Sequence, residues 1–202
     1  MQSIENEIRR FWDQTDKTAV AEEIHAQDSL RRLADCSREE MLLLFRHYRL
    51  FTIRHIDDLC WVLARLPFSE FKAFLSKVLF EEFGMETEQG YKNNHVHLLD
   101  AFMVTLGADQ SFCQDPELEL KSNRKLLDEL TTQVKENSIA YAIGLRGMGT
   151  ECLCQVYLTT IFNMAEKNPY FIKNKPHLDL RFEQLHRGPV EIEHRVDRKS
   201  VV

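Results

Sequence analysis

The chain has 202 residues, of which 44% are hydrophobic and 29% are charged, and this balance predicts a globular domain rather than a disordered segment. The net charge of −6 argues against non-specific binding to nucleic acid. No apolar run is long enough for a membrane span, and the first residues are amphipathic and acidic, unlike a signal peptide. The five cysteines form no disulfide framework, which is typical of a reduced cytoplasmic protein. We therefore expect a cytoplasmic protein with neither nucleic acid nor membrane as a partner.

The chain order predicts helices almost throughout. Apolar residues recur every three or four positions, and no strand alternation or hairpin turn dipeptide is present. The predicted helices span residues 2–14, 18–35, 37–67, 68–84, 93–107, 117–136 and 138–165, with a last helix from about 178, and the predicted loops are 85–91, 108–116 and 170–178. We expect an all-α fold of about seven helices in a single domain, residues 1–202.

Two helix starts have recognisable caps. Ser37 is a natural N-cap, and Glu40 three residues later completes a capping box. Asp115 followed by Pro116 predicts the start of the 117–136 helix. The 138–165 segment is apolar nearly all round, so it should be the central helix. Its small residues could leave a substrate channel beside Glu151; they are Gly144, Gly147 and Gly149.

Three candidate polar groups fall on inward faces of these helices. Glu151 lies in the most apolar helix, so it should be protonated, paired or bound to metal; the alternative is a partly exposed side chain that pairs with Arg146. Glu82 continues the apolar row of its helix, whereas Glu81 lies about 100° away around the axis. His95 also faces inward, whereas His97 lies about 200° away around the axis and should face solvent. For Glu81 and Glu82 the alternative is a solvated acidic helix end. For His95 the alternative is a hydrogen-bonded histidine of the core.

The end of the chain concentrates further candidate ligands. Glu191 and His194 are three residues apart, which places both on one helical face, as in helical bundles that hold iron or manganese. His186 would face away in an unbroken helix, but Gly188-Pro189 could bend the chain and bring it round. Carboxylates mixed with imidazoles favour iron or manganese over zinc. The remaining histidines were assigned structural or surface roles because they lack carboxylates at ligand spacing; they are His25, His47, His55 and His177.

Four motifs follow one another in a specific order. They are Glu81-Glu82-Phe83-Gly84, His95-Val96-His97-Leu98, Gly147-Met148-Gly149-Thr150-Glu151, and Phe182 with His186, Glu191 and His194. In this order and spacing, over roughly residues 37–194, the chain resembles the haem-oxygenase-like diiron oxidases, also called iron-containing redox enzymes. That group is related to thiaminase II, to pyrroloquinoline-quinone synthase and to the chlamydial death-domain-associated protein.

The resemblance implies a haem-oxygenase-like bundle and a non-haem diiron oxidase or oxygenase. Such an enzyme activates O₂ and acts on a small organic substrate, either amino-acid-like or fatty-acid-like. The implied ligands of two iron ions, with manganese as the other candidate metal, are Glu82 (or Glu81), His95, Glu151, His186, Glu191 and His194. The extra residue before Glu191, and Glu in place of the family's Asp, predict weaker binding of the second ion. Members often form homodimers, which leaves a homodimer open here.

Two other classes of function stay open. A metal-free member of the same fold would be a cofactor-pathway enzyme or a small-molecule-binding module, with Cys154 or Cys60 as the only proposals for a nucleophile. A partner-binding helical protein without chemistry would instead use its acidic surface.

Overall fold

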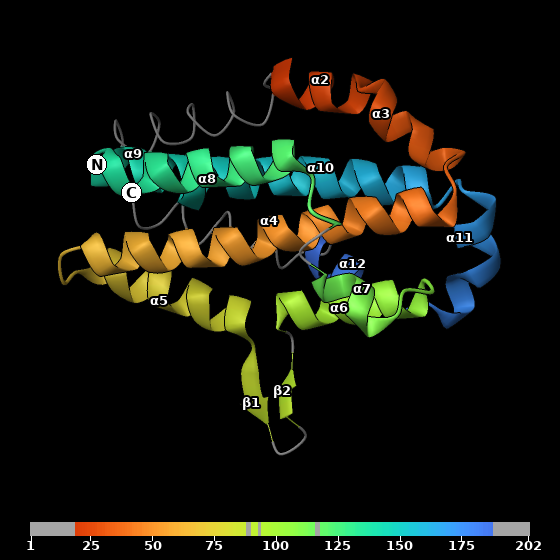
Figure 1. The fold of residues 1–202 in the computed structure, drawn as a ribbon. Coiled ribbons are helices and arrows are strands. Elements are labelled where there is room, and N and C mark those ends of the chain that lie inside the picture. The colour runs from red at the N-terminus through yellow and green to blue at the C-terminus, as the bar shows by residue number, and fades with distance from the viewer. Residues whose placement is uncertain (1–18, 88–89, 93, 116–117, 188–202) are drawn as a thin grey trace, which may run out of the picture.

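A computed structural model describes residues 19–87, 90–92, 94–115 and 118–187 (Figure 1). These residues form eleven α-helices that pack as one helical bundle, so the predicted all-α class is confirmed. The α-helices are α2 (Ala19–Ala26), α3 (Asp28–Arg31), α4 (Arg38–Arg65), α5 (Glu70–Phe83), α6 (His95–Thr105), α7 (Gln110–Gln114), α8 (Lys121–Glu136), α9 (Ile139–Ala142), α10 (Thr150–Ala165), α11 (Pro169–Asn174) and α12 (Arg181–Arg187). The predicted 2–14 helix lies outside the described residues.

Helix α4 is the axis of the fold. Its predicted capping box is present, because the Ser37 side chain accepts from the Glu40 backbone N at 3.2 Å and Glu40 Oε2 accepts from the Ser37 backbone N at 2.9 Å. The helix continues for 28 residues. Helices α5 and α6 lie end to end along one side of α4, and α8 lies along another (Figure 1). Every other layer therefore takes its position from α4.

Two apolar cores lie at the two ends of α4. The first includes Met41 and Phe45 of α4, and other side chains come from α3, the 3₁₀ helix η1 (Arg32–Ala34), α6, α7, α10, α11 and α12. The second includes Leu59 and Val62 of α4, and its partners come from α5, α8 and α9. Between them α4 buries polar side chains instead: Thr52, His55 and Asp58. The junction of the two cores is therefore the polar part of the interior.

A small hairpin joins α5 to α6, where the sequence predicted only a loop. Strands β1 (Met85–Thr87) and β2 (Gly90–Lys92) pair antiparallel, and they project from the joint between the two helices (Figure 1). Strands of three residues are too short to show alternation in the sequence. The hairpin brings the end of α5 and the start of α6 together, and the Asn94 side-chain amide closes the joint by donating to the Phe83 carbonyl at 2.9 Å.

Other predicted boundaries were wrong in detail. The 18–35 helix is divided into α2, α3 and the 3₁₀ helix η1 (Arg32–Ala34), and the 108–116 loop contains α7. Asp115 follows α7 rather than starting α8, which begins at Lys121. The 170–178 loop holds α11 and the 3₁₀ helix η4 (Lys175–His177), so the last helix begins at Arg181. These are short elements, whose formation depends on packing more than on local pattern.

The predicted 138–165 helix is continuous in direction but irregular in its middle. Between α9 and α10 the chain forms a π-helical segment, η3 (Ile143–Gly149). A Cβ on Gly149 would lie 2.9 Å from the Gly144 carbonyl oxygen, so this glycine permits the wider turn. Gly144 has open space where a Cβ would stand. Close approach of backbone, rather than a channel, accounts for Gly149. Among the described residues, no helix is long and apolar enough to cross a membrane.

Candidate metal centre

Glu82 occupies the last turn of α5 and faces the interior. Glu82 is only 8% exposed. The neighbouring residue, Glu81, is partly exposed, and its Oε1 lies 3.9 Å from Lys77 Nζ. The helix ends directly afterwards at Gly84, which has a φ of 80°. A carboxylate at a helix C-terminus opposes the helix dipole, so its burial requires a compensating partner. The predicted inward orientation of Glu82 is confirmed.

His95 supplies that partner. It is the first residue of α6, whose N-cap Asn94 accepts from the His97 backbone N at 3.0 Å. His95 Nδ1 lies 2.7 Å from Glu82 Oε2, and both side chains are buried. His97 is exposed, as predicted. Since an ionised carboxylate can only accept, the imidazole Nδ1–H donates in this contact.

His186 on α12 completes the group from the far end of the chain. Its ring centroid lies 4.8 Å from that of His95, with the planes at 68°. His186 Nδ1 lies 2.7 Å from the Phe182 carbonyl oxygen one turn back, and that oxygen can only accept a hydrogen bond. Nδ1–H therefore donates this hydrogen bond, which fixes the orientation of the ring. A histidine held in this way is oriented as metal-binding histidines usually are.

Glu183 is a buried acid that the sequence prediction passed over. Its side chain is buried on α12, three residues before His186. This Glu-x-x-His spacing places the two side chains on one helical face, and it is the spacing that metal-binding bundles use. The same spacing drew attention to Glu191 and His194, so the signal was available at Glu183 as well.

The structure describes the side chains of only half of the predicted ligand set. It brings together Glu82, His95 and His186, from α5, α6 and α12. Glu191 and His194 lie outside the described residues, and Glu151 lies at the start of α10, with no described side chain. Within the described part of the chain, no group of three or more His, Cys, Asp or Glu is arranged to hold a metal ion. The six-residue ligand set therefore stays a prediction.

A second buried polar pair joins α4 to η3. The Arg146 guanidinium of η3 binds Asp58 Oδ2 through Nε at 2.8 Å and Nη2 at 2.5 Å, and both side chains are essentially inaccessible. Asp58 lies three residues after His55, which is also buried. The statement that His55 lacks a carboxylate at ligand spacing was thus wrong. Arg146, suggested above as a partner for Glu151, belongs to this pair.

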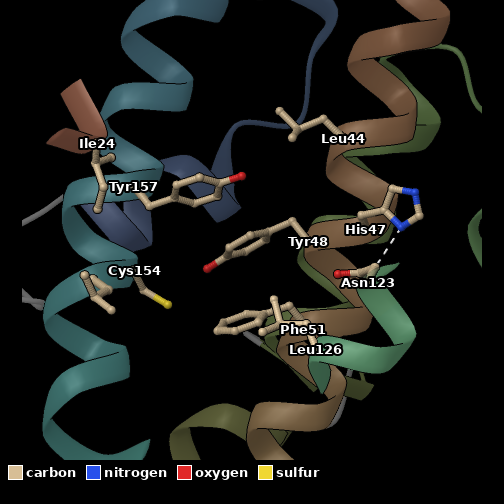
Figure 2. A pocket seen from close by; sticks show the side chains of 10 residues that line it. Ile24, Leu44, His47, Tyr48, Phe51, Asn123, Leu126, Cys154 and Tyr157 are labelled. Atoms are coloured by element: carbon tan, nitrogen blue, oxygen red, sulfur yellow. Dashed lines mark hydrogen bonds between the residues drawn. The ribbon is translucent and has the colours of Figure 1, made fainter. Parts of the chain in front are cut away.

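A cavity of about 370 Å³ opens between α4, α8 and α10, with Ile24 of α2 at one side. Figure 2 shows the Tyr48 and Tyr157 hydroxyls and the Cys154 sulfur directed into the space between α4 and α10. The ring centroids of Tyr48 and Phe182 are 6.1 Å apart, and those of Phe182 and His186 are 4.1 Å apart. One layer of aromatic rings therefore separates the cavity from His186.

The thiols differ in their surroundings. Burial raises the pKa of the thiols of Cys36, Cys60 and Cys113, so all three stay protonated and weakly nucleophilic at neutral pH. Cys154 differs because it lines the cavity. The structure places this cysteine, and not Cys60, beside a space that a small molecule could enter.

Comparison with known proteins gives no identification. No family model matches the chain, and neither the curated proteins nor the solved structures include a significant match.

Proposed function

We propose that this protein is a non-haem diiron oxidase or oxygenase that activates O₂ and acts on a small organic substrate. The observation that carries the proposal is the convergence of Glu82, His95 and His186 from three helices. All three side chains are buried, so they form a polar group inside the bundle. The resemblance of the sequence to the haem-oxygenase-like diiron oxidases supports the same function.

The chemistry of the donor set fits iron. Carboxylate oxygens and imidazole nitrogens are ligands that iron accepts. Glu82 Oε2 and His95 Nδ1 lie 2.7 Å apart, and Nδ1 would give up its proton when a metal binds. They would hold the first ion with Glu151. His186 would hold the second, with Glu191 and His194.

The chain's own groups would prepare this centre in two ways. The Phe182 carbonyl accepts from His186 Nδ1 and orients the ring. The two apolar cores on either side of the polar junction exclude bulk water, which strengthens electrostatic interactions within it. When bound, the iron ions would supply the electrons that reduce O₂.

Anaerobic loading with ferrous iron, followed by gel filtration and metal analysis, tests the proposal. We expect about two irons per full chain, as in di-iron helical bundles, and O₂ uptake when the loaded protein is exposed to air. Glu82→Gln and His95→Asn should each reduce the bound iron by about one ion per chain. Their matched controls are Glu81→Gln and His97→Asn, which change the same chemical groups on the outer faces of α5 and α6.

The control variants show which of two neighbouring residues binds the metal. If Glu81→Gln removed iron and Glu82→Gln did not, the first ligand would be Glu81 and the facing argument would be wrong. If the wild-type chain retained no iron, the oxidase proposal would be rejected. One iron per chain, lost in His95→Asn, would confine the metal to the first half-site and contradict the diiron assignment.

One observation favours a second candidate, a metal-free small-molecule enzyme of the same fold. Cys154 lies on the wall of a cavity, where a nucleophile would need to be. If this candidate is correct, wild-type protein without iron should react with iodoacetamide at Cys154 faster than at Cys60. Equal slow alkylation of both thiols would remove the candidate.

A further inference from the structure

The cavity between α4, α8 and α10 is built from uncharged side chains. Its inner wall is aromatic, with Tyr48, Phe51 and Tyr157, and its mouth is flanked by Leu126 and Leu153. These two leucines are 53% and 46% exposed. Its volume of about 370 Å³ falls within the usual range for small-molecule sites, about 300–1,000 Å³. No Lys, Arg, Asp or Glu is among the lining residues that the structure describes.

Two titratable groups on the wall, His47 and Tyr157, favour their neutral forms. Burial lowers the pKa of the His47 imidazole, and the nearby Arg46 cation lowers it further, with Glu119 acting in the opposite direction. Asn123 Nδ2 lies 3.3 Å from His47 Nδ1 on the same wall (Figure 2). Burial raises the pKa of the Tyr157 phenol, and Cys154 adds to this effect. A charged ligand would therefore lose its hydration and meet no opposite charge.

The polar groups that do reach the space are hydrogen-bonding and neutral. Figure 2 shows the two tyrosine hydroxyls extending from opposite helices, Tyr48 from α4 and Tyr157 from α10. A phenol hydroxyl can both donate and accept, so the pair suits a ligand hydroxyl or carbonyl. A few polar groups within apolar walls are the usual composition of a specific small-molecule site.

We propose that this cavity is a binding site for an uncharged, largely apolar small molecule that carries one hydroxyl or carbonyl group. A water's share of liquid volume is about 30 Å³, so the space equals about a dozen waters and fits a ligand of about that many non-hydrogen atoms. The Tyr48–Phe182–His186 ring contacts connect the wall of the cavity to the candidate metal centre. The site itself requires no metal, so it stands independently of the proposed oxidase function.

Isothermal titration of the full chain, treated with chelator, tests the site with two matched probes. 2-Naphthol is a bicyclic, uncharged phenol, and 2-naphthoate has the same rings with a carboxylate in place of the hydroxyl. We expect saturable binding of 2-naphthol with one molecule per chain. We expect the affinity for 2-naphthoate to be lower than that for 2-naphthol by about tenfold or more, because the charge of 2-naphthoate would be buried without a partner.

Two variants locate the bound probe. Cys154→Leu adds volume inside the cavity, and Leu126→Trp adds a large ring at its mouth, so each should weaken 2-naphthol binding by about tenfold. Thr132→Trp is the control, because Thr132 is an exposed, uncharged residue farther along α8 that does not line the cavity. Circular dichroism checks that each variant is folded.

Three results would overturn the inference: no binding of 2-naphthol, equal binding of 2-naphthoate, or equal binding by Leu126→Trp and Thr132→Trp when both are folded. Because the protein is free of metal, these results are separate from the iron experiment. Iron binding without 2-naphthol binding would support the oxidase and reject the cavity ligand. Binding of 2-naphthol without iron binding would support the cavity ligand and reject the oxidase.

Discussion

Replacement of Arg146 by methionine should destabilise the protein strongly. Methionine replaces the aliphatic stem of arginine with an unbranched apolar side chain, and it removes the cation that faces Asp58. The Asp58 carboxylate has no exposed surface, and its second oxygen, Oδ1, has no hydrogen-bond partner among the described residues. Removal of one partner from a buried ion pair typically costs about 3–5 kcal/mol, because the other charge stays buried alone. That is a large fraction of the total stability of a domain, about 5–15 kcal/mol.

Urea titration followed by circular dichroism measures the loss in the free energy of unfolding, and thermal unfolding measures the change in melting temperature. At about 2–4 °C per kcal/mol for a chain of this size, the melting temperature should fall by about 6–20 °C. The double variant Asp58→Leu with Arg146→Met should recover most of the stability, because no charge is then buried. Strictly additive effects of the two single substitutions, or a loss below about 1 kcal/mol for Arg146→Met, would show that the pair is not a buried ion pair.

Further predictions concern local features. Burial lowers the pKa of His47, so below about pH 6.5 the unfolded chain binds more protons than the folded chain. The free energy of unfolding should therefore fall as the pH drops through that value. In urea titrations at a series of pH values, His47→Asn should reduce this dependence on pH. Gly149→Ala should lower the melting temperature because its Cβ meets a backbone carbonyl, whereas Gly144→Ala should be neutral or stabilising; equal effects would contradict the close-approach argument. Ser37→Ala should cost about 1 kcal/mol in urea titrations, because the Glu40 N–H loses its acceptor.

Sequence alone determined the features that depend on one helix at a time. The capping signal at Ser37 located the start of α4, and helical periodicity separated buried Glu82 from half-buried Glu81 and buried His95 from exposed His97. These follow from a fixed repeat of 3.6 residues per turn, which no neighbour needs to supply. The all-α class followed in the same way from many such segments.

The tertiary structure decided which buried groups meet. Arg146 and Asp58 are 88 residues apart, and no local pattern joins a cation in a π-helical segment to an acid on α4. The contact between His95 and His186 similarly depends on how α6 and α12 pack. Short elements such as α7 depend on packing as well, because helices of a few residues gain too little from their own hydrogen bonds. Contacts between distant segments arise only when apolar faces pack together, and that choice is made by the whole chain.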